Sequence, residues 1–286
     1  MEVEHPFVFQ IDSDIVKKNY QENPNYLIQY SDDAMNQEYC TIYFCSHNIY
    51  FPNTESVFTK RIVENNFYEW YGTRVQKSYK HIFVRDIFKQ WYLTGINSTI
   101  DTPQKLLSFL QQETKGYKII TLGSSAGGYA AVLYGSLLKA EQVLAFNPQF
   151  EIKSLLASSD ESTDPLIFRL KDSPFFEYYD LCPWIDLQTV DLFYFYSTKS
   201  PWDQTQYEHS KDITGIHRIA FSTAHHGIPF LKVCLSRVIN LDKEKLLGLS
   251  RKKQYPFSFS VQMVGFWKVV HGLISQIYKV YIKKRV

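Results

Sequence analysis

Residues 120–131, "ITLGSSAGGYAA", place a glycine, two serines and two more glycines between two apolar segments. The preceding residues 117–122, "YKIITL", are β-branched, aromatic and apolar, which predicts a strand. Residues 126–140 predict a helix of about four turns. The stretch fits the pattern G-x-S-x-G with Ser125 at its centre, so a serine stands at a tight corner between a strand and a helix.

This corner is typical of a nucleophile elbow, in which a strained turn exposes a serine hydroxyl. The residues two before and two after the serine must be small, which explains Gly123 and Gly127. The free N–H groups of the following helix favour negative charge beside the hydroxyl. A plain glycine-rich turn is the alternative. A phosphate-binding loop requires a lysine after the glycines, and a dinucleotide fingerprint requires G-x-G-x-x-G, and neither fits.

The composition narrows the class of protein. The 286 residues are 45% hydrophobic and 16% aromatic, enough for a sizeable core. A net charge of +2 gives no electrostatic basis for binding nucleic acid. The N-terminus lacks the basic start and apolar core of a secretory signal, and no apolar run could span a membrane, so we expect a cytoplasmic protein. The four cysteines have no C-x-x-C spacing and are expected as buried thiols.

Short strands alternate with helical segments along the chain, which predicts an α/β fold with a mostly parallel central sheet flanked by helices. The predicted strands are residues 7–11, 26–30, 40–45, 81–86, 117–122, 142–147, 190–197 and 216–221. The predicted helices are residues 103–114, 126–140, 204–212, 229–240 and a long segment near 258–282.

Residues 151–186 interrupt this alternation with scattered acids, then aromatic residues and prolines. Such a segment is either a lid-like insertion over a binding site or a decorated crossover connection. We expect one domain over residues 1–250, containing this insertion, and a basic amphipathic helix over residues 251–286.

A catalytic serine requires a histidine further along the chain, and in the elbow fold an acid lies between them. His225 and His226 directly follow the strand at 216–221, where the carboxyl ends of parallel strands gather catalytic groups. Gly227 gives the loop freedom to present the preceding ring, which favours His226 as the base. His225 is then a neighbour or a substrate contact. No third metal ligand has a characteristic spacing, so we predict no metal site.

The acid should follow the strand at 190–197, where the loop offers Asp203 and then Glu208. Asp203 lies closer to the end of the strand, and its carboxylate would fix the tautomer of His226. Asp203 would also suit the N-cap of the next helix. The oxyanion needs two donors, for which we predict the N–H of Ala126 and, after the strand at 40–45, that of Ser46 or His47.

Together, the elbow, Asp203 and His226 resemble the α/β-hydrolase superfamily over about residues 39–240. The strings "FVRDIFKQWYLTGI", "LGSSAGGYAA", "AFNPQ" and "HHGIPF" are similar to a bacterial glycan-modification group within it, which includes serine-dependent O-acetyltransferases of capsule clusters and acetyltransferase-like accessory secretion proteins. One departure is Ser200, which stands where many hydrolases have their acid.

The resemblance implies a serine acyltransferase that moves acetyl from acetyl-coenzyme A to a hydroxyl of a capsular or surface polysaccharide, through acetyl-Ser125 and with no bound cofactor. A carboxylesterase or deacetylase with the same triad is the first alternative. A non-catalytic scaffold of a capsule or secretion complex is the second.

The triad does not explain the segment "VRDIFKQWYLTG" at residues 84–95. Trp91 and Tyr92 have aromatic faces that suit sugar stacking, and Asp86 could bind sugar hydroxyls. All three are therefore candidate substrate contacts. Burial of Trp91 in the core, below a pair formed by Arg85 and Asp86, is the alternative.

The C-terminal segment has polar residues near helical period and a wide apolar face that includes Phe266, Trp267 and Ile274. Basic clusters at 251–253 and 283–285 flank it. Three interpretations stay open: a helix on a membrane surface, a helix that covers the sheet, and a contact between copies of the chain.

Overall fold

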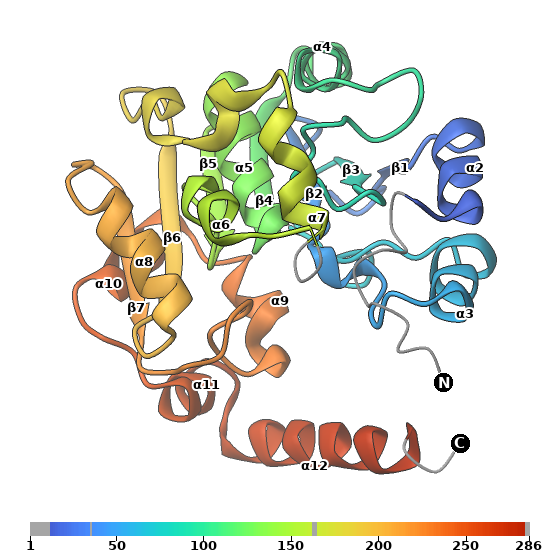
Figure 1. The fold of residues 1–286 in the computed structure, drawn as a ribbon. Helices are drawn as coiled ribbons and strands as arrows, with labels where there is room; N and C mark the ends of the chain where they lie inside the picture. The colour runs from blue at the N-terminus through green and yellow to red at the C-terminus, as the bar shows by residue number, and fades with distance from the viewer. Residues whose placement is uncertain (1–11, 35, 162–164, 284–286) are drawn as a thin grey trace.

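The computed structural model describes residues 12–34, 36–161 and 165–283. They form one seven-stranded sheet in the order β1-β3-β2-β4-β5-β6-β7, in which only β1 is antiparallel to its neighbour (Figure 1). The strands are β1 (Tyr26–Tyr30), β2 (Tyr39–Phe44), β3 (Lys80–Val84), β4 (Lys118–Ser124), β5 (Gln142–Phe146), β6 (Asp191–Ser197) and β7 (His217–Phe221).

The seven strands predicted between residues 26 and 221 are confirmed, with ends displaced by at most two residues. The strand predicted at 7–11 lies outside the described residues. The mostly parallel sheet with helices on both faces confirms the predicted fold class, an α/β-hydrolase fold. Because β2 to β7 run parallel, their carboxyl ends share one edge of the sheet, which we call the carboxyl edge.

Two apolar clusters fill the two faces of the sheet. One face packs against α4 (Pro103–Glu113), α5 (Ala126–Leu137), α8 (Pro201–Ser210) and the segment 151–186. The other packs against α2 (Asp14–Glu22), α3 (Glu55–Phe58), the π-helical turn η2 (Thr59–Glu64), α9 (Leu235–Val238), α10 (Lys243–Ser250) and α11 (Pro256–Val264). The sheet is thus buried on both sides, as its nearly continuous apolar strands require.

Two helix predictions need correction. Residues 229–240 form only the short turn η6 (Lys232–Cys234) followed by α9. The long helix predicted near 258–282 is two helices, α11 and α12 (Phe266–Lys283), because Gly265 between them has a φ of 87°. That conformation suits glycine and ends α11.

The segment 151–186 contains α6 (Lys153–Ser158), α7 (Pro165–Phe168) and three short 3-10 turns, η3 (Arg169–Asp172), η4 (Phe176–Tyr179) and η5 (Cys182–Trp184). It lies beside α5 (Figure 1), and the Tyr129 hydroxyl of α5 donates to the carbonyl of Tyr178 at 2.6 Å. Tyr178 and Leu181 join the same apolar cluster as α5. Its role as a lid stays a prediction.

In the described part of the chain, no helix combines the length and the apolar character needed to cross a bilayer.

Candidate active site

Ser125 occupies the corner between β4 and α5 with φ 53° and ψ −124°, a conformation that costs a non-glycine residue free energy. The neighbouring glycines make this corner possible. A Cβ on Gly123 would lie 2.0 Å from the carbonyl oxygen of Gly127, and one on Gly127 would lie 2.3 Å from the carbonyl oxygen of Phe44. The strained serine and its two obligatory glycines have the geometry of a nucleophile elbow.

A continuous hydrogen-bonded chain begins at this serine. The Ser125 hydroxyl lies 2.8 Å from Nε2 of His226, and Nδ1 of His226 lies 2.7 Å from Oδ1 of Asp203. The three residues come from the ends of β4, β6 and β7. The structure therefore brings together the serine, histidine and acid that the sequence singled out, in the order and contacts of a Ser-His-Asp triad.

Ser200 explains why Asp203 is free to face the histidine. The Ser200 side chain caps α8 by accepting the Asp203 N–H at 3.4 Å, so the N-cap role considered for Asp203 belongs to Ser200. The Asp203 side chain is buried, and its Oδ2 has no hydrogen-bond partner among the described residues. A buried carboxylate with the imidazole as its partner favours the charged form of that ring during proton transfer.

The loop of His226 is held from beneath by β5 and β6. Nδ2 of Asn147 donates to the carbonyl of Gly227 at 2.9 Å, and the Ser197 hydroxyl donates to the carbonyl of His225 at 2.6 Å. Gly227 has a φ of 100°, which agrees with the freedom expected of it. These bonds fix the backbone on both sides of His226.

Trp202 was not predicted as part of the site. Its half-exposed ring stacks on the ring of His226, with centroids 5.0 Å apart and planes 19° apart. It covers one face of the imidazole.

The two predicted donors for the oxyanion differ. The N–H of Ala126 begins α5, directly after the serine. The prediction that the N–H of Ser46 binds the oxyanion is wrong. This N–H donates to Oε2 of buried Glu69 at 2.5 Å, and the Ser46 hydroxyl donates to Oε1 at 2.9 Å. The N–H of His47 has no acceptor among the described residues. His47 is thus the remaining donor of the predicted pair.

The His47 ring also lies in this region. Its edge meets Trp91 with ring centroids 4.4 Å apart, and its Nε2 is buried without a partner among the described residues. Burial lowers the pKa of His47 well below its usual value, and the nearby charges of Lys89 and His226 add to this. The ring is therefore neutral near pH 7.

Gln149 is a further residue that the sequence did not single out. Its Nε2 donates to the Ser125 hydroxyl at 3.3 Å, and its Oε1 accepts the Trp91 indole N–H at 3.3 Å. Its position three residues after β5 was a usable signal, because that loop also lies at the carboxyl edge. Gln149 links Trp91 to the serine.

Two of the candidate substrate contacts are structural instead. The buried carboxylate of Asp86 accepts the N–H groups of Phe88, Gln90 and Tyr92 at 3.0, 2.7 and 2.9 Å. The Tyr92 hydroxyl donates to the carbonyl of Cys45 at 2.8 Å, and the side chain is 1% exposed. Neither group is available to a sugar.

Trp91 and Arg85 also depart from expectation. Trp91 is 3% exposed, so it packs under the site through Gln149 and His47 and offers no open face for stacking. Arg85 does not pair with Asp86. Its guanidinium donates to the Asn25 side chain at 3.0 Å and to a main-chain carbonyl at 3.1 Å.

His225 is the one candidate substrate contact whose ring is exposed beside the triad. Partial desolvation by the surrounding atoms, followed by the charges of Lys232 and His226, lowers the pKa of His225. Its role stays a prediction.

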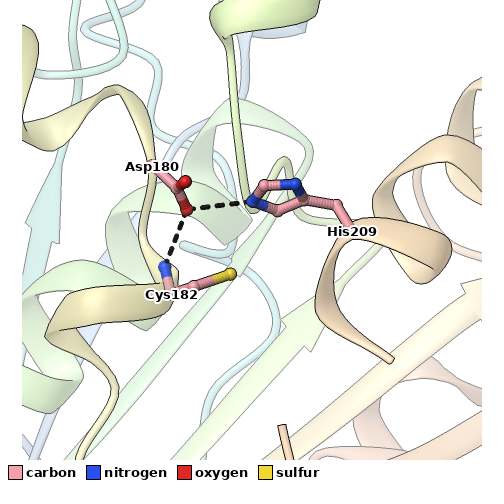
Figure 2. A group of neighbouring side chains, drawn as sticks. All are labelled: Asp180, Cys182 and His209. Carbon is pink, nitrogen blue, oxygen red and sulfur yellow. Dashed lines mark hydrogen bonds and ion pairs between the residues drawn. The ribbon is translucent and has the colours of Figure 1, made fainter. Parts of the chain in front are cut away.

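Among the described residues, Asp180, Cys182 and His209 are the one group whose side chains converge as metal ligands could, with ligand atoms within 4.8 Å of one another (Figure 2). His209 Nε2 lies 2.9 Å from Asp180, and Lys153 lies 3.3 Å from its other oxygen. Burial and the charge of Asp180 raise the pKa of the Cys182 thiol to about 12. We interpret the group as a clamp between the segment 151–186 and α8.

Comparison with known proteins gives structural likeness only. No protein-family model matches the chain, and no curated protein sequence matches it. A Staphylococcus aureus protein of unknown function has a TM-score of 0.52 and 12% identity over 79% of this chain and 94% of its own.

Two further structures are less similar. A capsule O-acetyltransferase of Neisseria meningitidis serogroup A has a TM-score of 0.44 and 13% identity over 67% of this chain and 78% of its own. Esterase B of Lactobacillus rhamnosis has a TM-score of 0.39 and 11% identity over 92% of this chain and 82% of its own. The order of the strands and the elbow after β4 identify the chain as an α/β-hydrolase fold.

Proposed function

We propose that this protein is a serine acyltransferase that O-acetylates a bacterial capsular or surface polysaccharide, with Ser125, His226 and Asp203 as its catalytic triad. The observation on which the proposal rests is the hydrogen-bonded chain from Ser125 through His226 to buried Asp203. The acetyl-coenzyme A donor and the polysaccharide acceptor come from the sequence resemblance.

In the first half-reaction, His226 Nε2 takes the Ser125 proton as the oxygen attacks the thioester carbonyl. The N–H groups of Ala126 and His47 would stabilise the oxyanion, and Asp203 the imidazolium. Collapse breaks the C–S bond and leaves acetyl-Ser125. The departing thiolate takes the proton from His226, so coenzyme A leaves as the thiol.

In the second half-reaction, His226 takes the proton of an acceptor hydroxyl, which attacks the acetyl carbon. The tetrahedral intermediate collapses, the acetyl ester of the sugar leaves, and the proton returns to Ser125. If water attacks instead, the product is free acetate and the enzyme is an esterase. The two functions therefore share the triad and differ in which hydroxyl reaches the acyl carbon.

A transferase must keep water from that carbon. Trp202 stacked on His226 and the segment 151–186 beside α5 are the proposed walls of the acceptor site, with His225 at its rim. Trp91 and Tyr92 are excluded from this role because both are buried.

The test is incubation with labelled acetyl-coenzyme A, with and without polysaccharide acceptors. We expect ping-pong kinetics, with coenzyme A released before acceptor is required, and label transferred to the polysaccharide faster than to water. Donor hydrolysis that no acceptor diverts would assign the esterase function. Absence of any acyl-enzyme or turnover would favour the scaffold.

A further inference from the structure

The exposed apolar residues of the described chain are concentrated in its last segment. Large hydrophobic side chains that are more than half exposed include Tyr255, Phe257, Trp267, Ile274 and Tyr278. Trp267 is 80% exposed, which is unusual for so large an apolar group. Such a cluster marks an interaction surface and not ordinary scatter.

α12 contacts the rest of the protein through one side and leaves large apolar residues exposed on another. Val269 is fully buried, and a Cβ on Gly272 would lie 3.2 Å from Val233 of η6, so this side faces the protein. Trp267, Ile274 and Tyr278 are seven and four residues apart, which places them together on another face that is open to solvent. In Figure 1, α12 extends along the outside of the molecule, away from the sheet.

The C-terminal segment that contains α12 has basic residues and no acidic ones. Residues 245–286 contain nine of the 31 lysines and arginines and none of the 29 acidic residues. The other 244 residues therefore have 22 basic against 29 acidic groups, a net charge of −7. Exposed aromatic side chains on a helix, in a segment with basic residues and no acidic ones, are typical of a helix that lies in the headgroup region of an anionic bilayer.

We propose that α12 docks this protein on an anionic lipid surface, with Trp267, Ile274 and Tyr278 inserted among the headgroups. The dock contacts η6, which belongs to the connection that follows β7 and His226. The proposal does not depend on acyl transfer. A Ser125→Ala variant retains α12 and should bind lipid as the wild type does.

The test is co-sedimentation of the full chain with vesicles of phosphatidylcholine alone or mixed with phosphatidylglycerol. We expect at least about tenfold stronger binding to the anionic vesicles, weakened by salt. Trp267→Glu should weaken that binding about ten- to hundredfold. Phe176→Glu is the matched control, because Phe176 is 70% exposed on another element, and it should bind as the wild type does.

Circular dichroism melting of both variants checks that they fold. Equal binding to neutral and anionic vesicles, or wild-type binding by Trp267→Glu, would overturn the proposal. So would a stable dimer that Trp267→Glu dissociates, because a second copy would then cover this face.

Discussion

Two loops at the carboxyl edge, the one after β4 and the one after β3, both have a sequence typical of a functional site. After β4, the backbone is strained so that Ser125 points outward to His226. After β3, residues 85–92 also contain positive φ angles, at Lys89, Trp91 and Tyr92, but their polar groups turn inward. The Asp86 carboxylate accepts N–H groups of its own loop, and the Tyr92 hydroxyl donates to the carbonyls of Val84 in β3 and of Cys45 directly after β2.

The loops after β4 and β3 differ in the partners of their polar side chains. Strain around Ser125 places its hydroxyl against His226, whereas strain around residues 89–92 is offset by bonds that Asp86 accepts from three main-chain N–H groups. Position at this edge therefore predicts where a site lies but not which side chains reach it. The loop after β3 supports the floor of the site through Trp91 and Gln149.

The largest effect should come from the loop after β4. Ser125→Ala should lower turnover by several orders of magnitude, about 10⁶-fold in comparable triads, with an unchanged melting temperature. His226→Ala should match it, whereas His225→Ala should be much milder. Ser124→Ala is the matched control for the serine, and a comparable loss in that variant would show that the wrong serine has been assigned.

Asp203→Asn should follow, with a loss of about 10⁴-fold in kcat, because the amide favours the wrong tautomer of His226. Glu208→Gln is its control, since Glu208 is exposed and bound to Lys211 at 2.9 Å. Steady-state kinetics on purified, folded protein measures both. A larger loss in the Glu208 variant would refute the assignment of the acid.

Removing the second proposed oxyanion donor, the N–H of His47, should lower kcat less than the loss of a triad residue. His47 is the first residue of the 3-10 turn η1 (His47–Ile49), and the preceding Ser46 is extended with ψ 174°, so proline fits at this position. His47→Pro removes the N–H and should lower kcat about 100- to 1000-fold.

His47→Ala separates the two roles of the residue, because it removes the ring and retains the N–H. It should lose clearly less activity than the proline variant. Equal kcat values in the two variants would assign any effect to the ring and exclude the main-chain donor.

The smallest effect on chemistry should come from the loop after β3. Asp86→Asn exchanges one acceptor for a donor that faces main-chain N–H groups, and should lower the free energy of unfolding by about 1–3 kcal/mol. Turnover per folded molecule should stay within about tenfold of wild type. Thermal melting and kinetics measure the two effects separately. Unchanged stability with a large loss of kcat would restore Asp86 as a substrate contact.

The sequence predicted the groups whose roles follow from strand ends. Ser125, Asp203 and His226 each follow a parallel strand closely, so the predicted strands were sufficient to bring them to one edge. The seven described strands follow in the same way from their apolar runs. The break at Gly265 was missed because the pattern of side chains continues across it, and only its φ of 87° separates α11 from α12.

The remaining errors concern contacts between distant residues. The N–H of Ser46 is occupied by Glu69, 23 residues away, which no local pattern reveals. The sequence around Asp86 is the same whether its carboxylate faces a ligand or, as here, its own loop. Gln149 and Trp202 became recognisable only when the folded loops placed them against Ser125 and His226.

In the proposed mechanism His226 activates Ser125 as a nucleophile, and a fluorophosphonate probe tests this activation without any acetyl donor or acceptor. Peptide mass spectrometry should locate one adduct, on Ser125, that forms at least about a hundredfold more slowly in His226→Ala. An adduct on another serine, no adduct at all, or an equal rate of labelling in His226→Ala would contradict the claim.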